Sequence, residues 1–491
     1  MCVPGRHAAQ RRYRDQPPGR RLSCARVRPA RSGKIIALCV ALLLGPVTSV
    51  AASSGGASAP GGSSGLSGAT GATGPFSATA MAKFRKKMSS AMKSLNADSG
   101  AYILDLTTGT TLFDDDGLVP RNPASVEKLY TLATALALYG PGGTLQTSVY
   151  GVGTLEPGGV WDGDLYLRGG GDPTFGERKF IKANYGVGTS VQALAKQLVA
   201  ATGITRVDGS IVGDESYFDS LRGDPASGYA PDPELVGELS ALSFDRGASG
   251  KEGSPPAYAA HELADALHAL KVHVSKRSQA GITPAGAKLL TSIASPPMST
   301  LAALTATPSD NFFAEMILKG LGARFGAGGT TAAGAAVVLK FLAALSITPA
   351  IVDGSGLSRS DLTSPVQVVT LLRDLSPGGP STLAPVGTAL RAALPIDGET
   401  GTLATRMIGT TAQGNCVAKT GTLSNASDLG GWCDGRFAFA LLMNHVDVTK
   451  AQHVQDKIVE ALAALDPPAS SGAQAKSAMK AASSSTATPS R

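Results

Sequence analysis

Residues 123–130 place a hydroxyl nucleophile and an amine one helical turn apart. Side chains at positions i and i+3 share one face of a helix, so the Lys128 amine is expected to reach the Ser125 hydroxyl. Apolar residues recur at helical spacing after Lys128 until Gly140-Pro141, which predicts a buried helix with Ser125 near its N-terminus. Burial favours a neutral amine, and a neutral lysine accepts a proton. Ser125 and Lys128 therefore have the chemistry of a nucleophile and its general base.

The four-residue pattern S-x-x-K is common, and the chain contains two more copies, which begin at Ser90 and Ser477. Two later motifs distinguish the Ser125 copy. They are Ser309-Asp310-Asn311 and Lys419-Thr420-Gly421, and the second occurs once in the chain. The order S-x-x-K, S-x-N, K-T-G is that of penicillin-recognising serine acyl enzymes. The alternative for the middle motif is an ordinary helix N-cap, because Ser, Asp and Asn are all favoured there.

Short helices and strands are expected to position these motifs. The S-D-N turn opens a predicted helix over residues 312–321, and residues 417–423, which carry K-T-G, are typical of a strand. Alternating apolar residues over 436–443 predict a strand that neighbours the K-T-G strand. A hairpin is expected over residues 101–113, and a last helix over 451–465. The K-T-G strand and its neighbours are therefore expected to form one wall of the site.

Composition and charge restrict the function classes. The chain has 491 residues, 43% of them hydrophobic and 16% charged, which is typical of a globular protein with more than one core. Its formal net charge is +7, but residues 1–34 alone carry ten basic residues and one Asp, a net of +9, which leaves −2 for the remainder. No basic stripe with interleaved aromatic residues remains, so a nucleic-acid partner is not expected.

The N-terminus has the pattern of a secretory signal peptide, expected over residues 1–52. The basic stretch leads into an apolar run at 35–44, which is short for a membrane span, and then into small residues at 50–52. The alternative is an anchor that stays uncleaved, but no stable transmembrane anchor is expected. A Gly/Ser/Ala linker is predicted over 53–78 and a disordered tail over 467–491. Export would place the protein in the cell envelope, in the periplasm or on the wall exterior, or would secrete it.

Two of the five cysteines follow the predicted signal peptide. Cys416 and Cys433 bracket the K-T-G motif, and export would expose them to an oxidising compartment. One hypothesis is a disulfide between neighbouring strands beside the site, and the other is a pair of buried thiols.

Two further patterns have weak functional content. His261, Asp265 and His268 share one helical face, but the segment is not H-E-x-x-H and has no further ligand cluster, so a solvated helix face is favoured over a metal site. The run Gly169-Gly170-Gly171 lacks the spacing of a phosphate-binding loop and is interpreted as a tight turn. No metal and no organic cofactor are therefore expected.

With its three motifs, the chain resembles the class C low-molecular-mass penicillin-binding proteins, the D-alanyl-D-alanine carboxypeptidase and endopeptidase group. The likeness covers about residues 80–465. Further segments resemble the group's signatures: Gly170-Gly171-Asp172-Pro173, residues 213–218, residues 353–359, Leu394-Pro395-Ile396 and Gly401-Thr402-Leu403.

The resemblance implies an α+β fold, the transpeptidase domain of penicillin-binding proteins and β-lactamases, with an antiparallel sheet made from both ends of the chain, helices and a helical subdomain. The catalytic domain is expected over residues 79–150 and 290–466. An inserted region is expected over 151–289, and it looks shortened relative to the family. Arg246 stands near a position where the family commonly has Asn, which leaves substrate preference and wall docking open.

The resemblance also implies roles for the motif residues. Ser125 would form an acyl-enzyme with Lys128 as base, and Ser309 with Lys419 would relay a proton to the leaving amine. Asn311 would orient the acyl amide.

The K-T-G segment would recognise the end of the substrate. Thr420, Gly421 and Thr422 are its expected substrate-binding and oxyanion-binding residues, with the backbone N–H groups of Ser125 and Thr422 facing the oxyanion. The implied substrates are peptidoglycan peptides that end in D-Ala-D-Ala, and β-lactams are the implied covalent inhibitors.

Two alternatives remain at this point. A β-lactamase would use a glutamate-held water, and residues 232–235 superficially resemble that element, although they precede S-D-N instead of following it. A non-catalytic protein that binds cell wall or β-lactams would keep the same fold.

Overall fold

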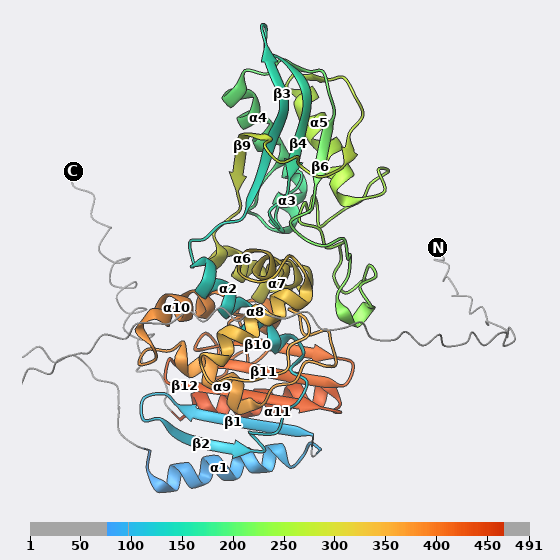
Figure 1. Cartoon of the computed structure of the whole chain (residues 1–491). Coiled ribbons are helices and arrows are strands. Elements are labelled where there is room, and N and C mark those ends of the chain that lie inside the picture. Colours follow the sequence, from blue (N-terminus) through green and yellow to red (C-terminus); the bar gives the residue numbers. More distant parts are fainter. Residues whose placement is uncertain (1–75, 97, 466–491) are drawn as a thin grey trace, which may run out of the picture. The chain divides into compact units, whose positions relative to one another are not determined.

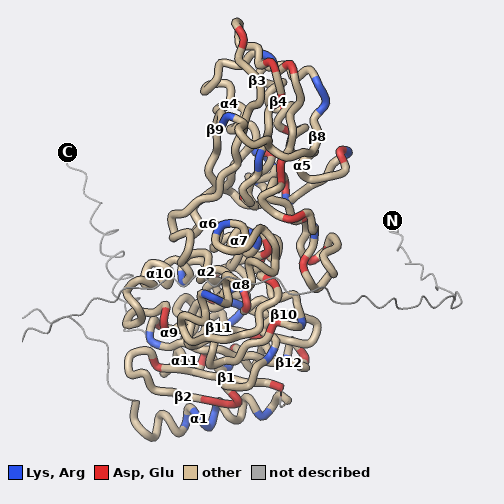
Figure 2. The backbone as a smooth tube through the Cα atoms, in the orientation of Figure 1, with Lys and Arg blue, Asp and Glu red and all other residues tan. Residues whose placement is uncertain are grey.

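The computed structural model describes residues 76–96 and 98–465. The predicted signal peptide, the predicted linker up to residue 75 and the predicted tail fall outside these residues. Within them, no helix has both the length and the apolar character that crossing a membrane requires. Charges of both signs are interspersed over the described chain (Figure 2).

The first sheet has five antiparallel strands in the order β10-β11-β12-β1-β2. Two come from the N-terminal part of the chain and three from the C-terminal part, and Figure 1 shows the blue strands beside the red ones. This topology confirms the expected α+β transpeptidase-like sheet. The strands are β1 (Ser99–Asp105), β2 (Thr110–Asp115), β10 (Cys416–Leu423), β11 (Ala426–Cys433) and β12 (Phe437–Asn444).

Helices cover both faces of this sheet, so its central strands are fully buried. In β12, Phe437 and Phe439 join a core with α1 (Ala78–Met92) and α11 (Val448–Ala463). The alternate residues Ala438 and Ala440 face the opposite core, where α9 packs. The period of two that predicted this strand thus reflects two different apolar layers.

The predicted pairing of the K-T-G strand with β12 is wrong, because β11 lies between them. The sequence of β11 includes Asp428 and Gly430-Gly431, which are depleted in strands, and it lacks apolar alternation. Close packing requires glycine at position 431, since a Cβ on Gly431 would lie 2.1 Å from the carbonyl oxygen of Val417 on β10. All eight residues of β11 are buried.

A layer of helices lies against the sheet face that carries the site (Figure 1). The helices α2 and α7 are buried on almost every side, as expected for helices that are apolar all round. The predicted Ser125 and S-D-N helices correspond to α2 and α7. The layer contains α2 (Lys128–Tyr139), α6 (Met298–Ala306), α7 (Asn311–Phe325), α8 (Thr331–Ala343), α9 (Pro365–Asp374) and α10 (Ala384–Ala393), with the 3-10 turns η1 (Ala124–Glu127), η3 (Ser381–Leu383) and η4 (Gly401–Leu403).

A second sheet of seven strands is built from the middle of the chain, and it has its own apolar core. β3 pairs antiparallel with β4 and β9, whereas β5 and β6 pair parallel with β4. The strands are β3 (Gln146–Glu156), β4 (Val160–Arg168), β5 (Arg206–Val207), β6 (Ile211–Asp214), β7 (His273–Val274), β8 (Gln279–Ala280) and β9 (Lys288–Ala294), and the helices are α3 (Arg178–Asn184), α4 (Val191–Thr202) and α5 (Pro255–Ala269).

The second sheet extends beyond the predicted insertion of 151–289, because that division cuts through β3 and β9. The His261 face lies on α5, where His261 is half-buried and its ring nitrogen is 3.7 Å from Asp265 and 4.0 Å from Glu252. Among the residues that the structure describes, no group of three or more His, Cys, Asp or Glu side chains is arranged to hold a metal ion.

A connecting segment, residues 215–254, runs from β6 to α5 and contains one short 3-10 turn, η2 (Pro225–Ser227). We call it the 215–254 segment. Its side chains Phe218, Leu235 and Leu239 belong to the same apolar core as α2 and α7. The middle part of the chain therefore contributes directly to the core beneath the site.

Candidate active site

The three sequence motifs meet in one place. Lys128 Nζ donates hydrogen bonds to Ser125 Oγ at 2.8 Å and to Asn311 Oδ1 at 2.7 Å. Lys419 Nζ donates to Ser309 Oγ at 2.7 Å. Both lysines have a relative exposure of 0%. An alcohol, two buried amines, a second hydroxyl and a carboxamide are thus assembled from η1, α2, the turn before α7, the start of α7 and β10.

Ser125 lies in the 3-10 turn η1. This turn ends at Glu127, directly before Lys128, the first residue of α2. The turn begins at Ala124 in a left-handed conformation, with φ of 44°. This places Ser125 where the N-terminal end of α2 presents partial positive charge, which stabilises negative charge that develops on a nearby oxygen.

A carbonyl group that the motifs do not include also contacts the nucleophile and the base. The backbone oxygen of Ser355 accepts hydrogen bonds from Lys128 Nζ at 2.6 Å and from Ser125 Oγ at 3.3 Å. Ser355 belongs to the 353–359 segment, whose resemblance to a family signature was the only sequence signal for it. A Cβ on Gly356 would lie 1.9 Å from the Ala124 carbonyl oxygen, so this loop packs tightly against η1.

Within the S-D-N motif, the middle residue caps a helix and the two outer residues belong to the site. Asp310 is the N-cap of α7 and accepts a hydrogen bond from Phe313 N at 3.0 Å. Since Asp310 is the residue that caps α7, the side chains of Ser309 and Asn311 remain available to the two lysines. Ser309 adopts a φ of 64°, which is uncommon for a residue other than glycine and turns its hydroxyl toward Lys419.

Arg246 holds the S-D-N turn from the 215–254 segment. Its guanidinium forms a bidentate ion pair with Asp310, at 2.7 and 3.1 Å, and donates to the carbonyl oxygens of Leu235 and Val236. It also lies over the Phe312 ring, 4.7 Å from the ring centroid. The residue that departs from the family pattern is therefore a structural partner of the second motif.

The 232–235 segment approaches the site through its backbone. Asn311 Nδ2 donates to the Glu234 carbonyl oxygen at 3.1 Å. The Glu234 side chain is exposed and makes no hydrogen bond to Ser125 or Lys128 among the described residues. This arrangement gives no support to a glutamate-held water at this position.

The K-T-G strand β10 packs against η1. A Cβ on Gly421 would lie 2.5 Å from the Pro123 carbonyl oxygen, so glycine is needed for this approach. Lys419 Nζ also donates to the Thr420 carbonyl oxygen at 2.8 Å, and the Thr420 hydroxyl donates to the Thr402 hydroxyl of η4 at 2.8 Å. Thr422 is exposed.

A disulfide joins Cys416, the first residue of β10, to Cys433, the last residue of β11, with their Cα atoms 4.1 Å apart. The two residues are paired directly opposite each other in the sheet. Of the two arrangements left open by the sequence, the structure contains the bridge. It ties together the two strands at the end remote from Thr422.

The chain matches a known protein family and is similar to named proteins. The model of the D-Ala-D-Ala carboxypeptidase 3 (S13) family matches residues 86–247 and 234–465. The chain belongs to this family. It is 30% identical over 457 residues to the D-alanyl-D-alanine carboxypeptidase of Actinomadura sp. (strain R39), which covers 75% of this chain and 81% of that protein. It is 27% identical over 445 residues to carboxypeptidase DacB of Mycolicibacterium smegmatis, with 84% and 92% covered.

The fold is similar to that of penicillin-binding protein 4 (dacB) from Haemophilus influenzae. The TM-score is 0.62 at 18% identity, over 76% of this chain and 98% of that one. A second structure of that protein, in complex with a β-lactam, gives a TM-score of 0.57 at 19% identity over the same shares. The resemblance to class C low-molecular-mass penicillin-binding proteins is confirmed.

Burial lowers the pKa of both site lysines in this S13 family member. It lowers the pKa of Lys128 to about 8, against the opposing influence of Glu127, Asp353 and Glu315. Burial also lowers the pKa of Lys419 well below its usual value, and the charge of Lys128 adds to that effect. With a pKa of about 8, roughly a tenth of the Lys128 amines are neutral at pH 7, and this neutral form is the one that a general base requires.

A cluster of four buried carboxyl groups lies beneath Lys128, and we call Glu127, Glu315, Asp353 and Asp361 the carboxyl cluster. Burial, followed by the neighbouring Asp353, raises the pKa of Glu315 to about 8 and that of Asp361 to about 10. Burial also raises the pKa of Glu127 well above its usual value. With these pKa values, Glu315 and Asp361 are largely protonated at neutral pH.

The carboxyl cluster also fixes the loop that carries Ser355. The Asp353 carboxylate accepts backbone N–H groups of Ser355, Gly356 and Ser358 at 3.1, 2.6 and 2.7 Å. Glu315 Oε1 accepts Gly354 N at 2.9 Å. The position of the Ser355 carbonyl therefore depends on side chains that never touch Ser125.

Proposed function

We propose that the protein is a serine D-Ala-D-Ala carboxypeptidase that acts on peptidoglycan stem peptides through an acyl-enzyme on Ser125. The observation that carries this proposal is the buried Lys128 amine, with a pKa of about 8, 2.8 Å from the Ser125 hydroxyl. Membership of the S13 family supports the substrate class.

Acylation proceeds by addition and elimination. Neutral Lys128 takes the Ser125 proton while Oγ attacks the carbonyl carbon of the D-Ala-D-Ala bond. The backbone N–H groups of Ser125 and Thr422 hold the oxyanion, and each donor of this kind contributes about 3 kcal/mol in acyl-transfer enzymes. The proton that Lys128 took is passed on through Ser309, which is hydrogen-bonded to Lys419, to the leaving amine. The C–N bond breaks to leave a serine ester, and Lys128 is neutral again.

The same groups bind the substrate and release the product. Lys419 with the hydroxyls of Thr420 and Thr422 receives the terminal carboxylate, while the Asn311 amide orients the acyl side. Water then attacks the ester while Lys128 accepts its proton, and Lys128 returns that proton to Ser125 Oγ as the C–O bond breaks, so Ser125 leaves as the alcohol and the enzyme is regenerated. Every step uses side chains and backbone groups of this chain.

The structure of the Haemophilus influenzae protein in complex with a β-lactam supports covalent inhibition of this chain by penicillins. Attack of Ser125 on the β-lactam carbonyl would open the ring and leave an ester that resembles the acyl-enzyme. Endopeptidase action on cross-linked peptides would use the same chemistry with a different leaving amine. We also propose that residues 1–52 direct export, which places the enzyme where its polymer is found.

Two substrates separate these activities. Protein lacking residues 1–52 is incubated with a muropeptide ending in D-Ala-D-Ala and with a cross-linked muropeptide dimer. D-Ala released from the first supports carboxypeptidase action, and cleavage of the second supports endopeptidase action. Ser125→Ala is expected to abolish both.

The matched control is Ser90→Ala, which removes the serine of another S-x-x-K copy, exposed on α1. It is expected to retain full activity. Labelling with a fluorescent penicillin should give a long-lived adduct on Ser125, whereas rapid steady-state penicillin turnover would favour the β-lactamase alternative. If Ser125→Ala still released the products and still formed the penicillin adduct, the proposal would be overturned.

A further inference from the structure

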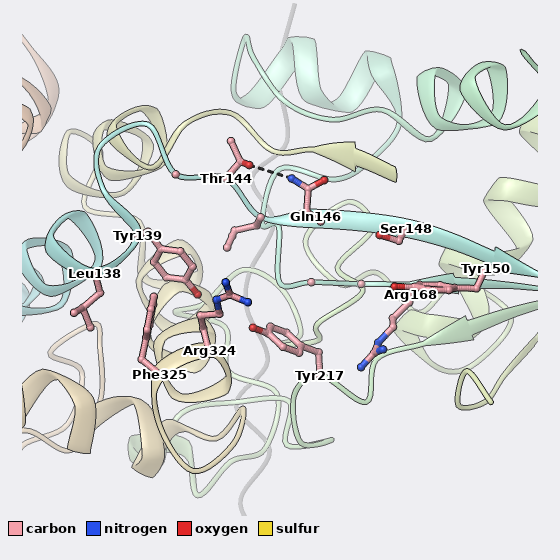
Figure 3. Close-up of a pocket in the computed structure, with 14 residues that line it drawn as sticks. Leu138, Tyr139, Thr144, Gln146, Ser148, Tyr150, Arg168, Tyr217, Arg324 and Phe325 are labelled. Carbon is pink, nitrogen blue, oxygen red and sulfur yellow. Dashed lines mark hydrogen bonds between the residues drawn. The ribbon is translucent and has the colours of Figure 1, made fainter. Parts of the chain in front are cut away.

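A second cavity, separate from the Ser125 cluster, lies where the C-terminal ends of α2 and α7 face the second sheet (Figure 3). Its volume is about 570 Å³. Asn311 begins α7 at the catalytic cluster and Arg324 lies near the other end, so at 1.5 Å per residue the two are about 20 Å apart along the helix. The cavity therefore does not belong to the site that cleaves the peptide.

The lining of this cavity is cationic. Among the described residues that line it are Arg168 and Arg324, and none of these residues is an Asp or a Glu. Within the described part of the chain, the Arg324 side chain has no hydrogen bond and no ion pair. Arg168 Nε is 3.7 Å from Asp214, whose two carboxylate oxygens already accept N–H groups of Ser216 and Thr283 at 2.8 and 2.9 Å. The cavity thus retains capacity for an anionic group.

A structural role for Arg324 is the simplest alternative. A basic residue in the last turn of a helix interacts favourably with the helix dipole. However, Figure 3 shows the Arg324 side chain extending between Tyr139 and Tyr217, within the cavity. A guanidinium in that position presents a planar fork, which matches a carboxylate.

Aromatic rings form the rest of the cavity's recognition surface. Tyr139 and Phe325 pack edge to face, with ring centroids 4.9 Å apart. The Tyr139 hydroxyl donates to the Gly320 carbonyl oxygen at 2.8 Å, which fixes the ring. Tyr150 and Tyr217 add two further amphipathic rings to the lining. Rings with an apolar face and a polar edge suit ligands that combine C–H surfaces with hydroxyl groups, as sugars do.

We propose that this cavity binds the glycan portion of peptidoglycan, at an N-acetylmuramic acid unit that carries no stem peptide and therefore keeps a free carboxylate. Arg324 and Arg168 receive the carboxylate, and Tyr139 and Tyr217 contact the sugar ring. The choice of a saccharide rests on the proposed function, whereas the choice of an anion rests on the two arginines.

The test uses Ser125→Ala protein, which removes turnover. It is titrated by calorimetry with the peptide-free disaccharide of N-acetylglucosamine and N-acetylmuramic acid, and with the neutral N-acetylglucosamine dimer. We expect the acidic disaccharide to bind and the neutral dimer to bind at least tenfold more weakly. Adding Arg324→Ala should weaken binding of the acidic sugar at least tenfold. Adding Arg178→Ala, an exposed arginine of α3 outside the cavity, should leave it unchanged.

Three results would overturn the proposal: no binding of the acidic sugar, equal binding of the neutral dimer, or no effect of Arg324→Ala. Arg324→Ala in the active enzyme should release D-Ala from a short peptide at the wild-type rate but show a raised KM on polymeric peptidoglycan. The two proposals can fail separately. If no variant released D-Ala, the catalytic function would be contradicted, whereas the sugar titration would still test binding at the cavity.

Discussion

Lys128 is the residue whose protonation limits the proposed reaction. Its pKa is lowered to about 8 by burial, and only the neutral amine accepts the Ser125 proton. The neutral fraction grows as pH rises, so the rate constant of penicillin acylation is expected to rise up to about tenfold per pH unit below 8 and to level off above it. Stopped-flow acylation between pH 6 and 9.5 measures this profile. A rate that is flat or falls over that range would rule Lys128 out as the base.

Lys419 gives a second prediction about protons. Its pKa is lowered by burial and by Lys128, yet its proposed role is to meet a carboxylate, which favours the charged amine. Binding of a D-Ala-D-Ala peptide to Ser125→Ala protein is therefore expected to take up a proton, in proportion to the neutral fraction of Lys419. Calorimetry in buffers of different ionisation enthalpy measures the uptake.

The control for proton uptake is the same peptide with a C-terminal amide, which offers no charge to Lys419. It is expected to bind without uptake. Equal uptake by the acid and the amide would mean that another group titrates.

Sequence reasoning could single out these residues, which the structure brings together, because each motif is short and carries its chemistry in side chains. Ser125 and Lys128 are three positions apart, and helical geometry alone brings them together. The Ser355 carbonyl could not be predicted, since it contributes a backbone atom from a loop 230 positions away from Ser125. Its placement depends on Asp353 and Glu315, whose burial follows from tertiary packing.

At the scale of elements, the sequence predicted the Ser125 helix, the helix after the S-D-N turn, the last helix and the strands over 417–423 and 436–443, and the errors have physical causes. The Ser125 helix begins with the 3-10 turn η1, because Ala124 has a left-handed backbone that no propensity rule anticipates. The sequence did not predict β11, because its two glycines and the buried Asp428 are residue types that are depleted in strands. Close strand packing, and not side-chain burial, determines the residue type at Gly431.

The contact between β10 and η1 can be tested at Gly421. A Cβ there would lie 2.5 Å from the Pro123 carbonyl oxygen and 2.9 Å from Asp428 Cβ, so Gly421→Ala must push the strand from the nucleophile turn. A displacement near 1 Å costs about 100-fold in rate when catalytic groups are misaligned, and we expect a loss of that order in penicillin acylation.

Gly142→Ala is the matched control for Gly421→Ala, since a Cβ at Gly142 meets nothing within 4 Å. It should acylate as the wild type does. Thermal melting of both variants checks that each is folded. Acylation of Gly421→Ala at the wild-type rate would show that the approach of β10 to η1 is not required.

At the scale of the whole chain, the central question is how its middle part serves the site. The second sheet has its own core, as expected for an inserted region, and its division from the catalytic domain remains a prediction. The sequence could not show that the 215–254 segment packs on α7. Besides Arg246 on Asp310, Asp219 pairs with the buried Lys319 at 2.5 Å. These ion pairs join the middle of the chain to the helix that carries Asn311.

Arg246 therefore links the middle of the chain to catalysis, and Arg246→Ala tests that link. The variant loses the bidentate pair with Asp310, two hydrogen bonds to backbone carbonyl groups and the stacking on Phe312. The ion pair is partly exposed, so we expect a loss of about 1–3 kcal/mol in the free energy of unfolding. Penicillin acylation is expected to slow by about tenfold or more, because Ser309 and Asn311 flank the released Asp310.

A purely structural role for Arg246 makes a different prediction. It lowers the melting temperature but leaves the acylation rate of the folded fraction unchanged, whereas a positioning role also changes that rate. Asp310→Asn keeps the N-cap acceptor of α7 and removes only the charge that Arg246 meets. If the pair positions the turn, the double variant Arg246→Ala/Asp310→Asn should acylate no more slowly than Arg246→Ala alone, since the two substitutions break one interaction. Additive losses would instead mean that Arg246 and Asp310 act on the site independently.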